Sequence, residues 1–135
     1  MEKSYEDKKV EKKIQEFWKK NKVFLFKKNK KNIFSIDTPP RYASGPLHIG
    51  HSTSYSHQDF IARYKKMRGF NVFYPLCFDV NGLPIEVNVE KLGISPEKVG
   101  RDNFVKECEK FAKKNIGIMT EQFEKLGFSM DHSIY

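Results

Sequence analysis

Two histidines, His48 and His51, stand three residues apart in the segment "GPLHIGH", with Gly50 between them. If this segment opens a helix, the spacing places both imidazole rings on one face of its first turn. Imidazoles there can donate hydrogen bonds to phosphate oxygens, and the free N–H groups at the start of a helix, near residues 47–49, also favour an anion. The H-x-G-H pattern alone is a weak signal, because two exposed histidines can also open a helix without any ligand.

The loop around the histidines strengthens the phosphate-site interpretation. The whole segment, "DTPPRYASGPLHIGH" (37–51), follows the short apolar run "IFSI" (33–36), which is typical of a strand. Ligands of open α/β sheets bind beyond the carboxyl ends of the strands, where this loop is expected to lie. Pro39 and Pro40 stiffen it, whereas Gly45 and Gly50 allow the backbone to approach a ligand closely. The strand–loop–helix context therefore predicts a phosphate site at His48 and His51.

The rest of the chain supplies elements that can hold such a loop. Apolar periodicity predicts a helix over residues 4–20 that begins with capping-box spacing at Ser4 and Asp7. The apolar face of this helix consists of Val10, Ile14, Phe17 and Trp18. Further helices are predicted over 47–68 and 102–126, ending at Gly69 and Gly127, and strands over 23–26, 33–36 and 71–75, with another beginning in 128–135. This alternation predicts an α/β fold, the first half of a doubly wound parallel sheet.

Composition limits the classes of function. The chain has 25 Lys and Arg against 17 Asp and Glu, a formal charge of +8 that favours polyanions such as nucleic acid or nucleotide phosphates, or only keeps the surface solvated. Cys77 and Cys108 lie far apart, so neither a zinc ribbon nor a disulfide framework is indicated. The short apolar runs and the charged N-terminus predict neither a membrane span nor a signal peptide, and we expect a cytoplasmic protein.

Three blocks of the sequence resemble a known family. "DTPPRYASGPLHIGH", "DFIARYKKMRGFNVFYP" and "FDVNGLPIEVNVEKLGI" occur in this order. Together they resemble the N-terminal half of the catalytic domain of class I aminoacyl-tRNA synthetases of the valine, isoleucine and leucine branch, whose HIGH motif matches "HIGH" (48–51). The resemblance covers about residues 10–135. Periodicity and the lysine-rich run predict an amphipathic helix and basic connector over 1–32, and the resemblance implies that 33–135 is the incomplete first half of a Rossmann-like parallel sheet.

The resemblance also implies roles for individual residues. His48 and His51 match the catalytic histidines that hold the ATP phosphates, and Gly50 matches the glycine that adenine or ribose approaches. Asp79 matches the aspartate that pairs with the amino group of the amino acid, although an Asp before Asn81-Gly82 can also simply cap a turn. Pro39 and Pro40 match the loop beside the amino-acid side chain.

Within this branch the resemblance favours valine and the archaeal type of enzyme, with isoleucine and leucine as alternatives. It implies valine, ATP accompanied by Mg²⁺, and tRNA as substrates, with no metal held by the protein. Departures fall beside the amino-acid pocket: Arg41 where many relatives have a third proline, Asn81 where they have histidine, and Cys77 and Phe78 before the aspartate.

The chain contains no KMSKS-type lysine segment and no editing or anticodon-binding domain. We therefore expect an N-terminal fragment that is inactive alone. A non-catalytic ATP-binding piece that docks a separate second half is an alternative. A second alternative is a small H-x-G-H adenylyltransferase that acts on a cofactor precursor. Enzymes of that class, however, lack the "GLPIE" block that this chain contains.

Overall fold

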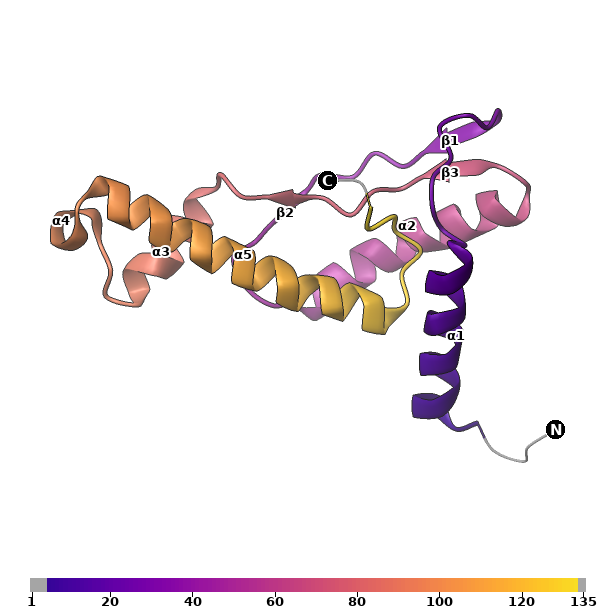
Figure 1. The fold of residues 1–135 in the computed structure, drawn as a ribbon, viewed down its shortest axis with the longest axis horizontal. Coiled ribbons are helices and arrows are strands. Elements are labelled where there is room, and N and C mark those ends of the chain that lie inside the picture. The colour runs from indigo at the N-terminus through magenta and orange to yellow at the C-terminus, as the bar shows by residue number, and fades with distance from the viewer. Residues whose placement is uncertain (1–4, 134–135) are drawn as a thin grey trace.

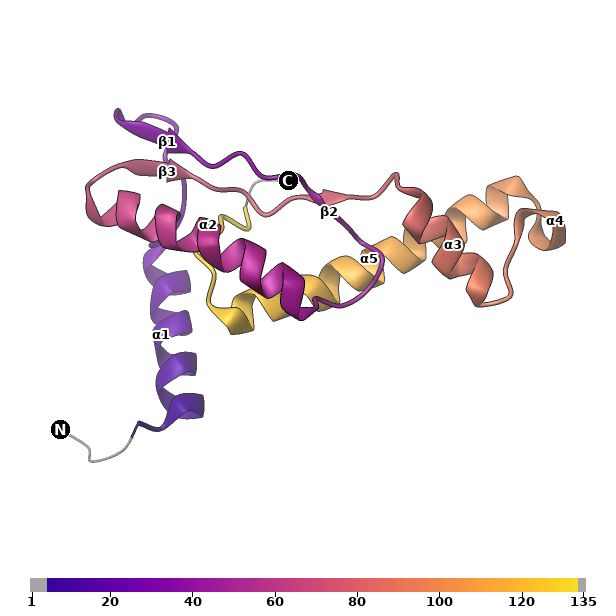
Figure 2. The ribbon, with the colours of Figure 1, turned by 180° about the vertical axis from the view of Figure 1, so that it is seen from behind.

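The computed structural model describes residues 5–133, which contain five helices and four short strands. In chain order they are α1 (Asp7–Asn21), β1 (Ile33–Ser35), β2 (Arg41–Tyr42), α2 (Ile49–Met67), β3 (Asn71–Phe73), β4 (Phe78–Asp79), α3 (Leu83–Lys91), α4 (Pro96–Val99) and α5 (Arg101–Leu126). Figure 1 shows an elongated molecule with α1 near one end and α4 at the other. Seen from behind in Figure 2, the strands again run along one side of α2 and α5.

Two short parallel ladders are built from the same two stretches of chain. β1 pairs with β3, and β2 pairs with β4 so that Tyr42 lies opposite Asp79. Residues 39 and 40, both prolines, separate β1 from β2, and Pro75 lies between β3 and β4. Proline has no N–H to donate to a ladder, which accounts for the break in both stretches. The helix α2 forms the crossover that parallel strands require.

The two long predicted helices are confirmed. The helix predicted over 47–68 is α2, and the one predicted over 102–126 is α5. Gly127 adopts the left-handed conformation (φ 73°) that ends α5, and Gly69 (φ 85°) follows α2. Both glycines therefore end their helices as the sequence predicts.

The main core lies between the strands and the helices α2 and α5. Val72, Tyr74 and Leu76 are buried at alternate positions, as expected for one face of an extended segment. They pack in one cluster with residues of α2, of α5 and of the chain after α5: Tyr55, Ala62, Phe123, Phe128 and Met130. A second cluster, Ala43 with Ile85 and Ala112, joins the loop after β2 to α3 and α5.

The predicted strand over residues 23–26 is wrong. Residues 22–24 form a turn after α1, and no strand pairs with this segment in the described part of the chain. Its aromatic rings are used for packing: Phe24 lies 5.2 Å from Trp18 and Phe26 lies 5.0 Å from Phe73, between ring centroids. Strand-like composition here reflects burial of apolar side chains and not a ladder.

The helix α3 was not predicted, because Asn81-Gly82 and Pro84 resembled a turn. Pro84 occupies the first turn of α3, where its missing N–H costs nothing. Ile85 and Val89, four residues apart, form the buried face. The helix α4 and the strands β2 and β4 were missed as well, since elements of two to four residues are too short to show a period.

The strand predicted to begin in 128–135 is present only as one parallel bridge between Pro75 and Asp131. The N–H of Asp131 donates to the carbonyl of Tyr74 at 2.7 Å, and the N–H of Leu76 donates to the carbonyl of Asp131 at 3.1 Å. Residues 134–135 of this prediction lie outside the described residues. The arrangement remains α/β, with short parallel sheets preceded by an N-terminal helix.

The N-terminal helix is confirmed as α1, and Ser4 of its predicted capping box lies outside the described residues. Only part of its predicted apolar face is covered: Trp18 is half-buried, whereas Ile14 and Phe17 are 39% and 59% exposed. The guanidinium of Arg63 in α2 lies over Trp18, 5.0 Å from the ring centroid. Among the described residues, no helix has both the length and the apolar character needed to cross a membrane.

Candidate functional site

The loop between β2 and α2 surrounds a cavity of about 410 Å³. Its lining residues all come from the segment that the sequence singled out: Pro40, Arg41, Tyr42, Ser44, Gly45, Pro46, His48 and His51. None of them is acidic, whereas Arg41 carries a positive charge and the two histidines supply N–H donors. The cavity therefore suits an anionic group.

His48 and His51 meet at this cavity, as predicted. His48 is the N-cap of α2 and His51 lies in its first turn. The two imidazole rings lie in contact, with centroids 3.4 Å apart and their planes tilted by 31°, and the backbone N–H of His48 donates to Nδ1 of His51 at 3.3 Å. Because Nδ1 of His51 accepts this bond, the proton of the neutral ring belongs on Nε2, which is then the donor available to a ligand.

The charge state of His51 follows from its surroundings. Burial, the nearby Arg41 and the adjacent His48 together lower its pKa to about 4. His51 is therefore neutral near pH 7 and acts on an anion through a hydrogen bond and not through a full positive charge.

The start of α2 supplies backbone donors. The N–H of Leu47 is not among them, because it donates to the side-chain carbonyl of Gln122 in α5 at 2.8 Å. This bond ties the loop to α5. The N–H groups of Ile49 and Gly50 belong to the first turn, where an α-helix offers them no internal acceptor. They remain available for an anion.

Gly50 has a specific steric role. A Cβ atom at this position would lie 3.1 Å from Cε1 and 3.2 Å from Nδ1 of His48. The His48 ring folds back over the helix at this point, and a larger residue would push it away. Gly50 itself is exposed and does not line the cavity.

Asp79 lies on the neighbouring strand, outside the lining of this cavity. Its Oδ1 accepts the backbone N–H of Asn81 at 2.9 Å, so the turn-capping role that the sequence left open is present. The other carboxylate oxygen makes no hydrogen bond within the described residues. Of the two prolines expected beside the amino acid, Pro40 lines the cavity and Pro39, which is exposed, does not.

The sequence did not assign Arg41 or Tyr42 to a site, and both line the cavity. The Tyr42 ring lies against Gly82, where a Cβ atom would collide with it. Asn88 of α3 donates to the carbonyls of Ser44 and Pro84, at 3.3 and 2.7 Å, which holds the loop against α3. An arginine inside a proline-rich loop that otherwise carries no charge after Asp37 was the available signal.

Glu86 and Glu90 lie on α3 and are exposed. Within residues 5–133, no group of three or more His, Cys, Asp or Glu side chains is placed to hold a metal ion.

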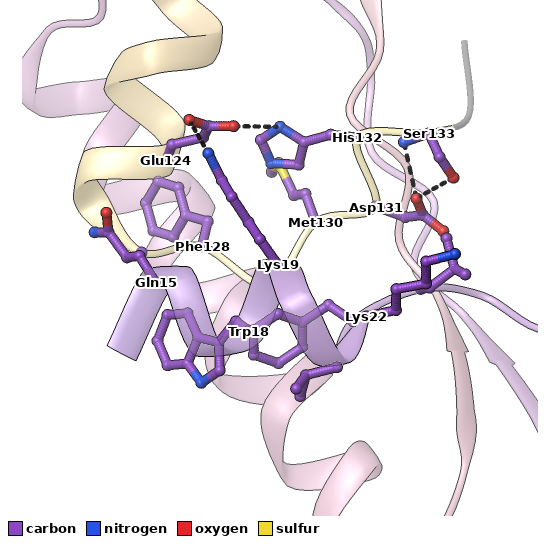
Figure 3. Close-up of a pocket in the computed structure, with 14 residues that line it drawn as sticks. Gln15, Trp18, Lys19, Lys22, Glu124, Phe128, Met130, Asp131, His132 and Ser133 are labelled. Carbon is purple, nitrogen blue, oxygen red and sulfur yellow. Dashed lines mark hydrogen bonds and ion pairs between the residues drawn. The ribbon is translucent and has the colours of Figure 1, made fainter. Parts of the chain in front are cut away.

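A second cavity, of about 360 Å³, lies between α1 and the end of α5 (Figure 3). Lys19 of α1 binds Glu124 of α5 at 2.8 Å, and Nδ1 of His132 lies 3.8 Å from the same carboxylate. The walls around this group are mostly aromatic and aliphatic, including Trp18 and Phe128. None of the predicted site residues lines this cavity, which is part of the junction that attaches α1.

Comparisons with known proteins identify the family that the chain resembles. A family profile described as tRNA synthetases class I (I, L, M and V) matches residues 13–134. The chain is 44% identical to the valine–tRNA ligase of Methanocaldococcus jannaschii over 124 residues, which is 90% of this chain and 14% of that protein. It is also 44% identical to the isoleucine–tRNA ligase of Pyrococcus horikoshii over 133 residues, 91% of this chain and 12% of that protein.

A solved structure has the same fold. It is the agnB2 LeuRS of Agrobacterium radiobacter K84 in a ternary complex with tRNA and LeuAMS, with a TM-score of 0.81 and 28% sequence identity. The match covers 96% of this chain and 15% of that chain. The chain thus spans about one seventh of the length of the proteins it matches.

Proposed function

The chain belongs to the class I tRNA synthetases of the isoleucine, leucine, methionine and valine group, and on this premise we propose that it is the ATP-binding first half of the catalytic domain of a valine–tRNA ligase. Residues 33–135 are the half-domain, and residues 1–32 are its N-terminal helix and basic connector. The observation that carries the proposal is the cavity without acidic residues at the start of α2, where the His48 and His51 rings lie in contact.

The reaction we propose has two steps. The carboxylate of valine attacks the α-phosphorus of ATP, the bond to the β-phosphate oxygen breaks, and pyrophosphate leaves the aminoacyl-adenylate. A ribose hydroxyl of the terminal adenosine of tRNA then attacks the acyl carbon, the bond from this carbon to the phosphate oxygen breaks, and AMP is released. Negative charge accumulates on the phosphate oxygens during the first step. Nε2–H of His51, an N–H of His48 and the backbone donors of Ile49 and Gly50 are suited to stabilise it.

The amino-acid side of the site is proposed at the adjacent strand ends. The carboxylate of Asp79 is suited to pair with the ammonium group of valine, since its second oxygen is not used by the turn. Pro39 and Pro40 form the apolar wall for the branched side chain. ATP arrives with its own Mg²⁺, which neutralises phosphate charge when bound.

Valine and isoleucine are best separated with two chimaeras, because the chain is equally identical to one enzyme of each kind. The chain replaces the matching segment of the M. jannaschii valine–tRNA ligase in one chimaera and of the P. horikoshii isoleucine–tRNA ligase in the other. Pyrophosphate exchange is measured with valine, isoleucine, leucine and methionine. We expect valine-dependent exchange in the first chimaera and loss of isoleucine-dependent exchange in the second. The reverse pattern would contradict the assignment to valine.

The second candidate is a non-catalytic piece that binds ATP and docks a separate second half. One edge of β1 has no partner strand within the described residues, and its Ile33 is 54% exposed. Titration of the isolated chain with ATP, together with gel filtration, distinguishes the two candidates. Tight ATP binding by the chain, with two inactive chimaeras, favours this second candidate.

A further inference from the structure

Arg41 is the one lining residue of the cavity with a permanent positive charge. Its side chain is half-buried, and its Nε and Nη1 atoms are covered by protein without any hydrogen-bond acceptor. No carboxylate within the described residues forms an ion pair with it. A buried, unpaired donor of this kind costs free energy, and buried guanidinium groups normally have a partner.

The positive charge of Arg41 affects the titratable side chains around it. Its positive charge acts on two residues of α2. It adds to the effect of burial that lowers the pKa of His51, and it opposes the rise that burial causes in the pKa of Tyr55. Burial lowers the pKa of Arg41 itself, and Tyr55 offsets this in part. Arg41 lines one cavity with His48 and His51 at the start of α2, whereas the ring of the neighbouring residue Tyr42 packs against Gly82. This alternation along β2 separates Arg41 from the Asp79 side of the site.

We propose that Arg41 is a binding residue for a phosphate group of the nucleotide, acting beside His48 and His51. A planar guanidinium binds phosphate through two parallel N–H···O bonds along one edge. Each edge that contains Nη2 pairs it with Nε or with Nη1, so one of these two unpartnered nitrogens gains an acceptor. Nη2 is not among the covered nitrogens, so a phosphate meets the guanidinium from that edge. The inference rests on the proposed function for the identity of the ligand, and on the cavity alone for its charge.

The test compares ligands with and without phosphate. Pyrophosphate, ATP and adenosine are titrated calorimetrically into the chain and into the valine-host chimaera. The variants are Arg41→Met, which removes the charge, and Arg41→Lys, which keeps the charge and removes the planar fork. Arg101→Met is the matched control. Arg101 is exposed at the start of α5, so this substitution removes the same charge outside the cavity.

We expect Arg41→Met to lower the affinity for pyrophosphate and for ATP by about 10- to 100-fold and to leave the affinity for adenosine unchanged. Arg41→Lys is expected to be intermediate and Arg101→Met to bind like the wild type. Equal pyrophosphate affinity in Arg41→Met and wild type overturns the proposal. If such a variant also melts at a lower temperature, Arg41 has only a structural role.

The outcome for Arg41 and the outcome for the proposed function are separable. Valine-dependent exchange with an unchanged KM for ATP in Arg41→Met overturns the role of Arg41 and leaves the ligase function standing. If Arg41→Met weakens pyrophosphate binding but the chimaera activates no amino acid, the role of Arg41 stands and the ligase function is overturned. A wild-type chain and chimaera that bind neither pyrophosphate nor ATP overturn both.

Discussion

The backbone N–H of His48 donates to Nδ1 of His51 at 3.3 Å, and the centroids of the two tilted imidazole rings lie 3.4 Å apart. The bond fixes the side chain of His51 and occupies one of its two nitrogens. A residue at the third position of a helix that reaches back to the N-cap backbone is half of a capping box. The pair thus closes the start of α2 and also presents its remaining N–H groups to the cavity.

Replacing either histidine should therefore impair the chemistry more than the fold. We expect His48→Ala and His51→Ala each to lower kcat for pyrophosphate exchange in the valine-host chimaera by about 10²- to 10³-fold. His57→Ala is the matched control, since His57 is an exposed histidine of the same helix outside the cavity. Exchange at the wild-type rate in a variant that carries both His48→Ala and His51→Ala would falsify the catalytic role of the pair.

Gly50→Ala separates stability from ligand binding. Alanine is favoured over glycine inside a helix by about 1 kcal/mol, so the free energy of unfolding should be equal or higher. The new Cβ atom, however, meets the His48 ring at 3.1 Å and must displace it. We expect weaker ATP binding by calorimetry without loss of stability in urea. Gly117→Ala, which has open space around the added atom, should keep the wild-type affinity.

Two substitutions of Asp79 distinguish its charge from its turn-capping bond. Asp79→Asn keeps an oxygen that accepts the N–H of Asn81, whereas Asp79→Ala removes it. Both lose the carboxylate, and both should raise KM for valine in the chimaera. Only Asp79→Ala should also lower the free energy of unfolding, by about 1 kcal/mol. An unchanged KM for valine in Asp79→Asn would leave only the structural role.

Arg63 holds α1 to the body of the protein. Its guanidinium lies 5.0 Å from the Trp18 ring and 5.2 Å from the Phe24 ring, and its Nε donates to the buried carboxylate of Asp59 at 2.7 Å. Arg63→Ala leaves this carboxylate without its charge partner, and we expect a loss of about 3 kcal/mol in urea unfolding. Lys19→Ala, which removes an exposed ion pair between α1 and α5, should cost less than about 1 kcal/mol. Equal effects of the two variants would contradict this account.

His132 makes stability depend on pH. Burial lowers its pKa below the ordinary value of 6.5, an effect that Glu124 and Asp131 oppose and Lys19 supports. The unfolded chain therefore binds a proton at a higher pH than the folded chain does. The stabilisation is present above the unfolded pKa and is lost as the pH falls below about 6.5.

Urea unfolding at about pH 7.5, 6 and 5 measures this dependence. The free energy of unfolding should fall with pH in the wild type and fall less in His132→Gln. His51 contributes in the same direction, because its pKa is lowered to about 4. His57→Gln, on the exposed face of α2, should follow the wild-type curve. A wild-type stability that does not change over this range would refute the role of His132.

The sequence by itself determined the long helices and the place of the site. Periods of 3.6 residues in 47–68 and 102–126, each followed by glycine, are local patterns long enough to identify a helix without knowledge of its partners. The H-x-G-H spacing likewise places His48 and His51 on one turn of whichever helix they begin. The strand at 33–36 and the loop that follows it could be predicted without knowing which residues they pair with.

The tertiary structure alone decided which side chains meet. Residues 23–26 have strand-like composition but no partner strand, because their rings pack against Trp18 and Phe73. Arg41 and Tyr42 entered the site for a similar reason: β2 pairs with β4, and alternation along the strand directs adjacent side chains to different surroundings. Pairing and burial depend on residues distant in the chain, such as Asp79 opposite Tyr42, and no local pattern encodes them.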